Sequence, residues 1–414
     1  MSLCRSRPMT APWLSVIGIG EDGVEGLSSL ARQIIAQAEI VIGGERHLRL
    51  AGSVIRGATE TWGSPFSDGI QRVLEMRGKP VTVLASGDPF FFGVGSTLSR
   101  HLESGELICV PASSSIAWAC ARLGWSQQDV RVLSLCGRLL ETLAPHLQPA
   151  LRLVVLSADG NTPGMVCRFL ADRGFGKSRV HVLERLGGPD ECIRRFRAED
   201  GTLPVADLNL IGIEVKADKD AQIIPLASGL DDDLFEHDGQ ITKREIRAIT
   251  LSTLAPRAGE VLWDIGGGAG SVAIEWMLRH PSNRAIAIEQ NSERAARISR
   301  NALTLGVPGL QVVEGRAPGA LVSLDRPDAV FIGGGLTNED IFMQARKALP
   351  VGGRLVANAV TLEGEAILAV QHARYGGTLT RIGIERLDAV GRLHAFRPAM
   401  RVTQYGTIIS GGSE

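Results

Sequence analysis

A run of small residues in the second half of the chain has the residue types of a nucleotide-like ligand site. The segment VLWDIGGGAGSVAIEW carries a carboxylate followed by this run, at Asp264, Gly266, Gly267, Gly268, Ala269 and Gly270. Glycine lets a ligand approach the backbone closely, and open α/β sheets bind such ligands at the carboxyl ends of their strands. The segment predicts a binding turn between a strand and a helix, although a glycine cluster alone could equally be a plain strand-to-helix turn.

Two later segments strengthen the ligand hypothesis. The next apolar run ends in AIEQN, where the Glu289 carboxylate can accept hydrogen bonds from two ribose hydroxyls. The run after it ends in VVEGRAP, which places Gly315, Arg316 and Ala317 where an adenine ring is expected. The Asp264 carboxylate would lie too close to the negative pyrophosphate of a dinucleotide. These three segments therefore favour S-adenosylmethionine as the ligand.

The first half carries a weaker glycine pattern. Gly18, Gly20 and Gly23 spell G-x-G-x-x-G after an apolar run, which is the fingerprint of dinucleotide binding. The next apolar run, residues 40–42, is followed by two glycines instead of the acidic residue that this fingerprint requires. A dinucleotide-dependent oxidoreductase stays open as an alternative, as does a methyltransferase that acts on RNA or protein.

Short apolar runs alternate with helical segments in both halves, which predicts an α/β fold. Expected strands in the first half are 14–17, 40–42, 81–85, 107–110, 130–135 and 151–156, with a helix at 27–38. Expected strands in the second half are 261–265, 285–289, 311–314, 329–332 and 354–357, with helices at 271–279 and 292–305. The alternation stops at residues 223–240, and a chain of 414 residues normally forms more than one domain. We therefore predict domains at 1–224 and 228–414.

The composition of the chain restricts the classes of partner that it can bind. A formal net charge of −1, from 44 basic and 45 acidic residues, leaves no broad basic field for nucleic acid or an anionic membrane. Neither a signal peptide nor a run of about 18 apolar residues occurs, so we expect a cytoplasmic protein. The cysteines lack C-x-x-C spacing and nearby histidine pairs, so we expect reduced thiols and no metal site. They are Cys4, Cys109, Cys120, Cys136, Cys167 and Cys192.

The first half resembles the tetrapyrrole methylase family over residues 14–215. The resemblance rests on SGDP at 86–89, PASSS at 111–115 and the opening GIG. It implies two α/β subdomains with S-adenosylmethionine in the cleft between them. It also implies that the cofactor is bound by Gly87, Asp88, Ser114 and Ser115. The substrate would lie against Gly18 and Gly20. Asp88 could equally be a turn residue before Pro89. Glu21 and Cys136 depart from the family, which often has proline and histidine there.

The second half, from about residue 228, is similar to the decarboxylating methyltransferases of the corrin pathway, a Rossmann-like class I methyltransferase fold. The similarity begins in QITKREIRAITLSTLAPRAGEVLWDIGGGAGS and implies that Thr242 lies over the cofactor. Thr242 could also be the N-cap of a helix over residues 243–249.

The order of the two halves resembles the fused methyltransferases of cobalamin synthesis. It implies methylation of precorrin-6B at ring carbons 5 and 15, with decarboxylation of the ring C acetate, to give precorrin-8X. The first half would methylate carbon 5. The second half would methylate carbon 15 and decarboxylate. Each domain would bind one S-adenosylmethionine, without metal, in a homo-oligomer.

The end of the chain offers cations for the carboxylates of such a substrate. Strands are expected at residues 380–387 and 400–408, with the second as an antiparallel edge strand. The loop between them would then lie at the ligand-binding edge of the sheet. It holds Arg392, His394 and Arg397, and the planar fork of arginine suits carboxylates. A solvated loop or a subunit contact is the alternative.

Overall fold

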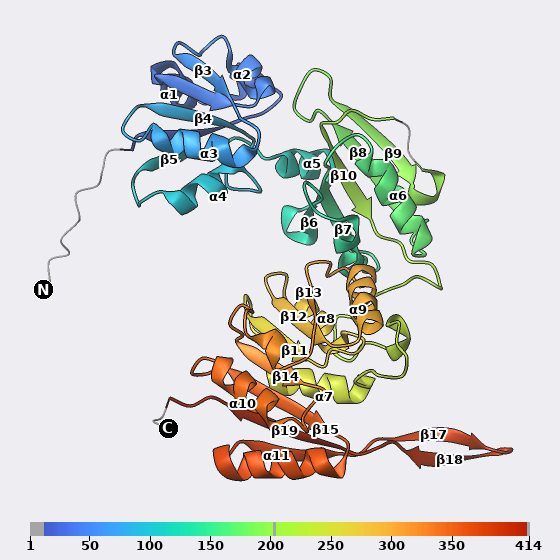
Figure 1. Cartoon of the computed structure of the whole chain (residues 1–414). Coiled ribbons are helices and arrows are strands. Elements are labelled where there is room, and N and C mark those ends of the chain that lie inside the picture. The colour runs from blue at the N-terminus through green and yellow to red at the C-terminus, as the bar shows by residue number, and fades with distance from the viewer. Residues whose placement is uncertain (1–11, 202–203, 412–414) are drawn as a thin grey trace, which may run out of the picture. The chain divides into compact units, whose positions relative to one another are not determined.

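The computed structural model describes residues 12–201 and 204–411 and divides into two α/β units (Figure 1). Unit 1 runs up to Leu140 and resumes from Gln148 to Gln222. Unit 2 contains Glu141–Leu147 and the chain from Ile223 onward. The predicted α/β class is confirmed, whereas the domain limits 1–224 and 228–414 stay a prediction about independent folding.

Unit 1 begins with a parallel sheet of order β3-β2-β4-β1-β5. Its strands are β1 (Leu14–Ile19), β2 (Ile40–Gly43), β3 (Ala58–Thr61), β4 (Val81–Ser86) and β5 (Leu107–Val110). Its helices are α1 (Ser29–Gln37), α2 (Glu45–Ala51), α3 (Phe66–Glu75) and α4 (Val94–Leu98). Val16 and Ile17 are both fully buried, in separate apolar clusters. Burial on both faces explains the continuous apolar runs of the sequence.

The second sheet of unit 1 is mixed, with order β6-β7-β10-β8-β9. Its strands are β6 (Val130–Ser134), β7 (Arg152–Leu156), β8 (Arg179–Glu184), β9 (Cys192–Arg197) and β10 (Asn209–Glu214). Helices α5 (Ser115–Leu123) and α6 (Thr162–Asp172) accompany it. α5 follows the last strand of the first sheet and packs its Ile116 and Ala119 with residues of the second. The serine segment before α5 therefore links the two sheets.

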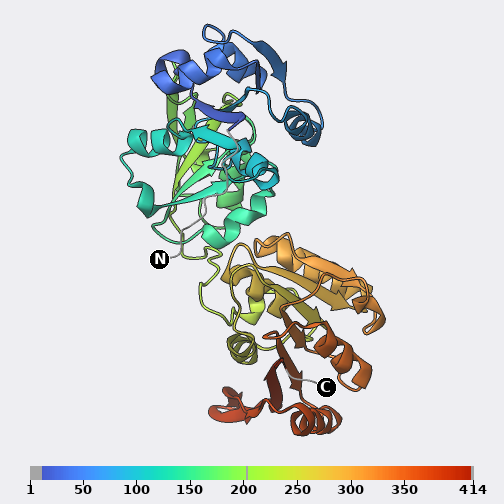
Figure 2. The same ribbon diagram turned by 90° about the vertical axis from the view of Figure 1, so that its left-hand side faces the viewer.

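Unit 2 holds a seven-stranded sheet of order β13-β12-β11-β14-β15-β19-β16, with helices on both faces (Figure 2). Its strands are β11 (Val261–Ile265), β12 (Arg284–Glu289), β13 (Gln311–Glu314), β14 (Ala329–Ile332), β15 (Arg354–Ala359), β16 (Thr378–Ile382) and β19 (Val402–Ile408). Its helices are α7 (Arg244–Leu254), α8 (Ser271–Arg279), α9 (Ser292–Thr304), α10 (Glu339–Ala348) and α11 (Leu362–Tyr375). The strands from β11 to β15 run parallel, so their carboxyl ends share one edge.

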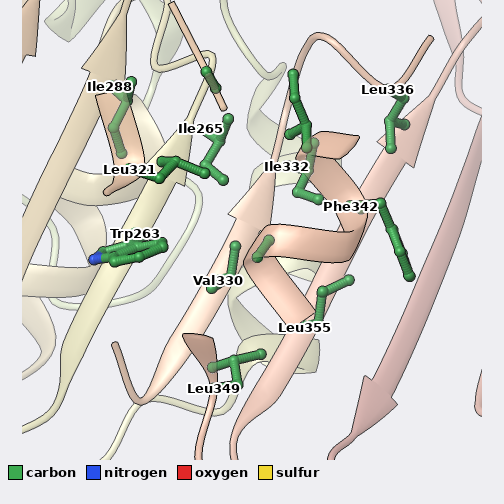
Figure 3. Close-up of a cluster of buried hydrophobic side chains, with 14 of the residues drawn as sticks. Trp263, Ile265, Ile288, Leu321, Val330, Ile332, Leu336, Phe342, Leu349 and Leu355 are labelled. Carbon is green, nitrogen blue, oxygen red and sulfur yellow. The ribbon is translucent and has the colours of Figure 1, made fainter. Parts of the chain in front are cut away.

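The core of unit 2 is an apolar layer on one face of this sheet (Figure 3). Trp263, Val330 and Leu355 come from neighbouring strands and pack with Phe342 of α10. The Trp263 indole nitrogen also donates a hydrogen bond to the Asp325 carbonyl oxygen at 3.0 Å. This layer fixes β11 and β14, which lead into the candidate site.

Two expectations for the end of the chain are wrong. β19 is antiparallel but lies between β15 and β16, so β16 is the edge strand. The expected strand at 380–387 is interrupted after Ile382, and the expected loop is a hairpin of β17 (Glu385–Val390) and β18 (Leu393–Pro398). The hairpin extends away from the sheet, and all its residues are exposed (Figure 1).

Candidate functional site

The glycine turn of unit 2 joins β11 to α8 with a backbone that side chains would obstruct. Gly266, Gly268 and Gly270 have φ angles of 77°, 59° and 76°, a region that favours glycine. A Cβ atom on Gly266 would also lie 2.9 Å from the Gly334 nitrogen. The turn therefore packs against Gly333–Gly335, the GGG that follows β14. Our sequence analysis missed this second glycine run, although a strand ending in GGG was a visible signal.

Asp264 is the last residue but one of β11 and is almost fully buried, with 1% of its surface exposed. Its carboxylate accepts a hydrogen bond from the Ala273 amide of α8 at 3.1 Å. Burial, together with the negative charge of Glu289, raises the pKa of Asp264 to about 7. A cationic ligand at this position would favour the ionised carboxylate.

Glu289 ties the glycine turn to the ends of β12 and β13. Its two carboxylate oxygens accept hydrogen bonds from the Gly268 amide at 3.0 Å and the Asn291 amide at 2.9 Å. Its carbonyl oxygen accepts one from the Gly315 amide at 2.9 Å. The structure thus brings together the residues that the sequence placed at three strand ends. Beyond Gly315, Arg316 is exposed, whereas the Ala317 side chain packs in the apolar core.

The segment before α7 passes over the glycine turn. A Cβ atom on Gly268 would lie 3.0 Å from the Gln240 carbonyl oxygen, two residues before Thr242. The N-cap of α7 is Lys243, without a side-chain capping bond, so the N-cap expectation for Thr242 is wrong. The Thr242 carbonyl oxygen instead accepts a hydrogen bond from Arg247.

Arg247 and Glu275 anchor this segment through an ion pair whose side chains are fully buried. Glu275 also accepts hydrogen bonds from the amides of Gly229 and Leu230, at 2.7 and 2.9 Å. A buried charge needs such partners. Our sequence analysis missed this pair, because the apolar pattern of the two helices does not show that Arg247 and Glu275 face each other.

The candidate site of unit 1 is made mainly of backbone. A Cβ atom on Gly18 would lie 1.8 Å from the Gly87 carbonyl oxygen and 2.5 Å from the Ala112 nitrogen. That same carbonyl oxygen accepts a hydrogen bond from the Ala112 amide at 3.1 Å. Gly87 has a φ angle of 54°, and its own Cβ position lies 3.0 Å from the Ser114 Cα. The GIG, SGDP and PASSS motifs therefore meet, and Gly18 packs between the other two.

Around this joint, Asp88 and the serines have local structural roles. The Asp88 carboxylate accepts a hydrogen bond from the Phe90 amide at 2.9 Å, the turn arrangement considered above. The Ser114 hydroxyl caps α5 by accepting from the Ala117 amide at 3.1 Å. Ser115 opens α5, whose first amides are free of intrahelical partners and suit a carboxylate. Gly20 lies beside the Asp22 carboxylate.

A polar cluster at the same edge was not foreseen. Arg46 forms an ion pair with Glu21 and donates a hydrogen bond to the Ser86 hydroxyl at 2.9 Å. The His47 Nε2 atom lies 2.8 Å from that hydroxyl. Burial and the charge of Arg46 lower the pKa of His47 to about 4, so the ring is neutral near pH 7. This cluster holds Ser86, the first residue of SGDP, in place.

An aromatic surface follows the SGDP turn. Phe90, Phe91 and Phe92 are 45%, 41% and 50% exposed, and Phe92 has a φ angle of 53°. The Arg138 guanidinium carbon lies 5.7 Å from the centre of the Phe92 ring. Exposed aromatic rings can stack on a flat ligand, and the Arg138 cation beside them can bind a carboxylate of that ligand. Our sequence analysis used SGDP at 86–89 but not the three phenylalanines that follow it.

The three candidate substrate-binding residues of unit 2 lie on the hairpin. Arg397 forms an ion pair with Asp388 of the opposite strand at 3.2 Å. Arg392 is in the turn, and His394 is exposed on β18. Their role toward a substrate stays a prediction.

Three further features concern the part of the chain that the structure describes. Within residues 12–201 and 204–411, no group of three or more His, Cys, Asp or Glu side chains is arranged to hold a metal. In the same part of the chain, no helix is long and apolar enough to cross a membrane. Cys109, Cys120, Cys136, Cys167 and Cys192 are free thiols there, and Cys4 lies outside the described residues.

Comparisons with known proteins match both halves. Residues 14–200 match the family of tetrapyrrole (corrin/porphyrin) methylases, and residues 233–408 match the precorrin methyltransferase domain. A Sinorhizobium protein named precorrin-6Y C(5,15)-methyltransferase [decarboxylating] is 54% identical over 96% of both chains.

Two shorter relatives each cover about half of the chain. A Salmonella typhimurium cobalt-precorrin-7 C(5)-methyltransferase is 30% identical over 47% of this chain and 92% of its own length. A Pyrobaculum calidifontis protein is named a probable cobalt-precorrin-6B C(15)-methyltransferase (decarboxylating). It is 33% identical over 43% of this chain and 95% of its own length.

Proposed function

The chain belongs to the family of decarboxylating precorrin-6Y C(5,15)-methyltransferases, and on that premise we propose its substrate, cofactor and division of labour. It methylates precorrin-6B at ring carbons 5 and 15 and removes the ring C acetate carboxylate as carbon dioxide, giving precorrin-8X in cobalamin biosynthesis. The observation that carries this proposal is the 54% identity over 96% of both chains. A chain of this family is a methyltransferase, which leaves the oxidoreductase alternative without support.

The two units divide the reaction. Unit 1 methylates carbon 5, because residues 14–200 match the tetrapyrrole methylases. Unit 2 methylates carbon 15 and decarboxylates, because residues 233–408 match the precorrin methyltransferase domain. The existence of half-length relatives named for each methylation supports this division. Each unit binds its own S-adenosylmethionine.

The residues of each candidate site fit that cofactor in a different way. In unit 2, the buried Asp264 carboxylate suits its positive charge, and Glu289 suits its ribose hydroxyls. In unit 1, the amino end of α5 suits its carboxylate, and the SGDP turn lets it approach the backbone. The cofactor supplies an electrophilic methyl group and the macrocycle supplies the carbon nucleophile, so the chain's main task is to orient them.

The macrocycle also supplies the electron sink for decarboxylation, since its conjugated pyrroles can accept the electron pair when protonated. This chemistry requires no metal. Phe92 and Arg138 of unit 1 suit the flat, anionic substrate. The exposed apolar residues of the hairpin, such as Leu393 and Phe396, suit a second copy of the chain, which supports a homo-oligomer. We further propose a cytoplasmic enzyme that binds neither nucleic acid nor membrane.

The direct test incubates the full chain with precorrin-6B and S-adenosylmethionine and determines the mass of the product. We expect the gain of two methyl groups and the loss of one carbon dioxide. An unchanged tetrapyrrole, together with binding of NAD and not of S-adenosylmethionine, would overturn the proposal.

A further inference from the structure

A basic groove lies in unit 1, at the end of the second sheet where β7 and β8 begin. Its volume is about 540 Å³, and its charged lining consists of Arg152, Lys177, Arg179, Arg197, Lys216 and Glu214. The opposite end of this sheet faces the candidate site, because a Cβ atom on Gly188, after β8, would lie 2.7 Å from Glu21. The groove is therefore separate from the candidate methyl-transfer site of unit 1.

Four of these residues form one row across four neighbouring strands. Glu214 of β10 is in register with Arg152 of β7 and with Arg179 of β8, and Arg179 is in register with Arg197 of β9. With the usual strand spacing of about 4.8 Å, the row is about 14 Å long. Three guanidinium groups along such a length suit an anion with several separated carboxylates better than a single small anion.

The charges of the groove are only partly compensated. Glu214 lies 3.6 Å from Arg179, Lys177 pairs with Asp218 at 2.6 Å, and Arg197 pairs with Glu199 at 3.6 Å. Five cations against these three carboxylates leave a local charge of +2, in a chain whose net charge is −1.

Two cations of the groove are available to a ligand. Arg152 and Lys216 have no ion pair in the described part of the chain. Arg152 lies 5.4 Å from the centre of the Trp125 ring, which positions its guanidinium group without neutralising it.

We propose that this groove binds the carboxylates of a polycarboxylate tetrapyrrole, and so holds the macrocycle on the enzyme outside the candidate methyl-transfer site of unit 1. The inference rests on the proposed function, since the tetrapyrrole is the polyanion that function supplies. The groove is an additional, electrostatic binding site for the same class of molecule. It raises the concentration near the enzyme of the substrate, or of the intermediate that has received only one of the two methyl groups.

The test compares two full-length double variants that lose the same charge. Arg152→Gln with Lys216→Gln removes the two unpaired cations of the groove. Arg131→Gln with Arg168→Gln is the control, because both arginines are exposed in unit 1 and neither lines the groove. The probe is uroporphyrin, an octacarboxylate porphyrin, titrated by its absorbance at low salt. We expect binding at least tenfold weaker in the groove variant and changed less than twofold in the control.

Equal affinity in the two variants would overturn the proposal. In a competition experiment, inorganic triphosphate and a second polycarboxylate porphyrin are each titrated against bound uroporphyrin. If triphosphate displaces the uroporphyrin at the lower concentration, the groove is a phosphate site and the proposal is overturned. Lys216→Gln alone provides the same comparison with a single exposed side chain changed. Because these measurements need no methyl transfer, failure of the proposed function shows separately, as absence of product from precorrin-6B.

Discussion

The two candidate cofactor sites use different parts of the chain for a similar task. In unit 2, two buried carboxylates, Asp264 and Glu289, lie at or next to the ends of neighbouring parallel strands beside a glycine turn. In unit 1, the joint is made of the Gly18 and Gly87 backbone and the amino end of α5, and the Asp88 carboxylate is already used in its own turn. A site made of charged side chains can be inferred from residue types and spacing. A site made of backbone is recognised only through resemblance to a family.

The largest expected effect comes from filling the backbone joint. Gly18→Ala should abolish methylation of carbon 5 while carbon 15 is still methylated, because the new methyl group would lie 1.8 Å from the Gly87 carbonyl oxygen. The product mass should then show one added methyl group instead of two. Gly44→Ala is the matched control, since its Cβ would have only ordinary contact, at 3.5 Å, with the His47 ring. If the Gly18→Ala variant adds both methyl groups at the normal rate, the cofactor site of unit 1 is not made of this backbone joint.

In unit 2 the corresponding change removes a side chain. Glu289→Ala should weaken S-adenosylmethionine binding to that unit by about 1 to 3 kcal/mol, the usual effect of losing charged hydrogen bonds. Calorimetry on the full chain should show one weakened site and one unchanged site. Glu314→Ala is the control, because Glu314 is in register with Glu289 on β13 but is exposed. Two unchanged sites would remove Glu289 from the cofactor site.

The same difference explains what the sequence could predict. Strands β11 and β14 have the predicted bounds, because buried parallel strands are short apolar runs bounded by glycine or polar residues. The half-exposed edge strand β13 also has its predicted bounds. The Arg247–Glu275 pair was missed because apolar periodicity does not show which charged residues face each other inside the unit. The cluster of Arg46, His47 and Ser86 joins segments about 40 residues apart, which no local pattern reveals.

The hairpin was missed for another reason. In the expected strand at 380–387, the apolar residues Ile382, Ile384 and Leu387 are separated by polar residues or glycine, which favours a single strand. That alternation normally marks a strand with one buried face. Here the chain leaves the sheet after Ile382, and both faces of the following ribbon are exposed.

A smaller effect should distinguish the sites by pH. Burial raises the pKa of Asp264 to about 7, so this carboxyl group in the unit 2 site loses its proton between pH 6 and 8 when no cofactor is bound. The cationic cofactor favours the deprotonated carboxylate. Affinity for S-adenosylmethionine at that site should rise by up to about tenfold over this range, and Asp264→Asn should remove the dependence. Unit 1 should stay flat, because the pKa of His47, about 4, lies below the range.

The raised pKa also affects stability, with the opposite direction. The folded chain holds this proton at higher pH than the unfolded chain, so protonated Asp264 stabilises the fold at low pH. That contribution is lost as the pH rises through about 7. The free energy of unfolding of the Asp264→Asn variant should therefore fall less than that of the unmodified chain between pH 5 and 8. Parallel curves from urea titrations would contradict the assignment.

The smallest expected effect concerns the hairpin, where charged side chains are present but exposed. Arg392→Gln with Arg397→Gln should raise the KM for the tetrapyrrole in carbon-15 methylation. Exposed ion pairs contribute about 0.2 to 1 kcal/mol each, so the rise should be a few-fold. Arg397 must also exchange its ion pair with Asp388 for one with the substrate, which reduces its contribution. Affinity for S-adenosylmethionine should not change, because both arginines lie on the hairpin and the glycine turn lies between β11 and α8.

Arg374→Gln with Arg401→Gln is the charge-matched control, outside the hairpin in the same unit. Normal carbon-15 methylation kinetics in the hairpin variant would rule out substrate binding by Arg392 and Arg397 and leave the hairpin as a surface for a second copy of the chain.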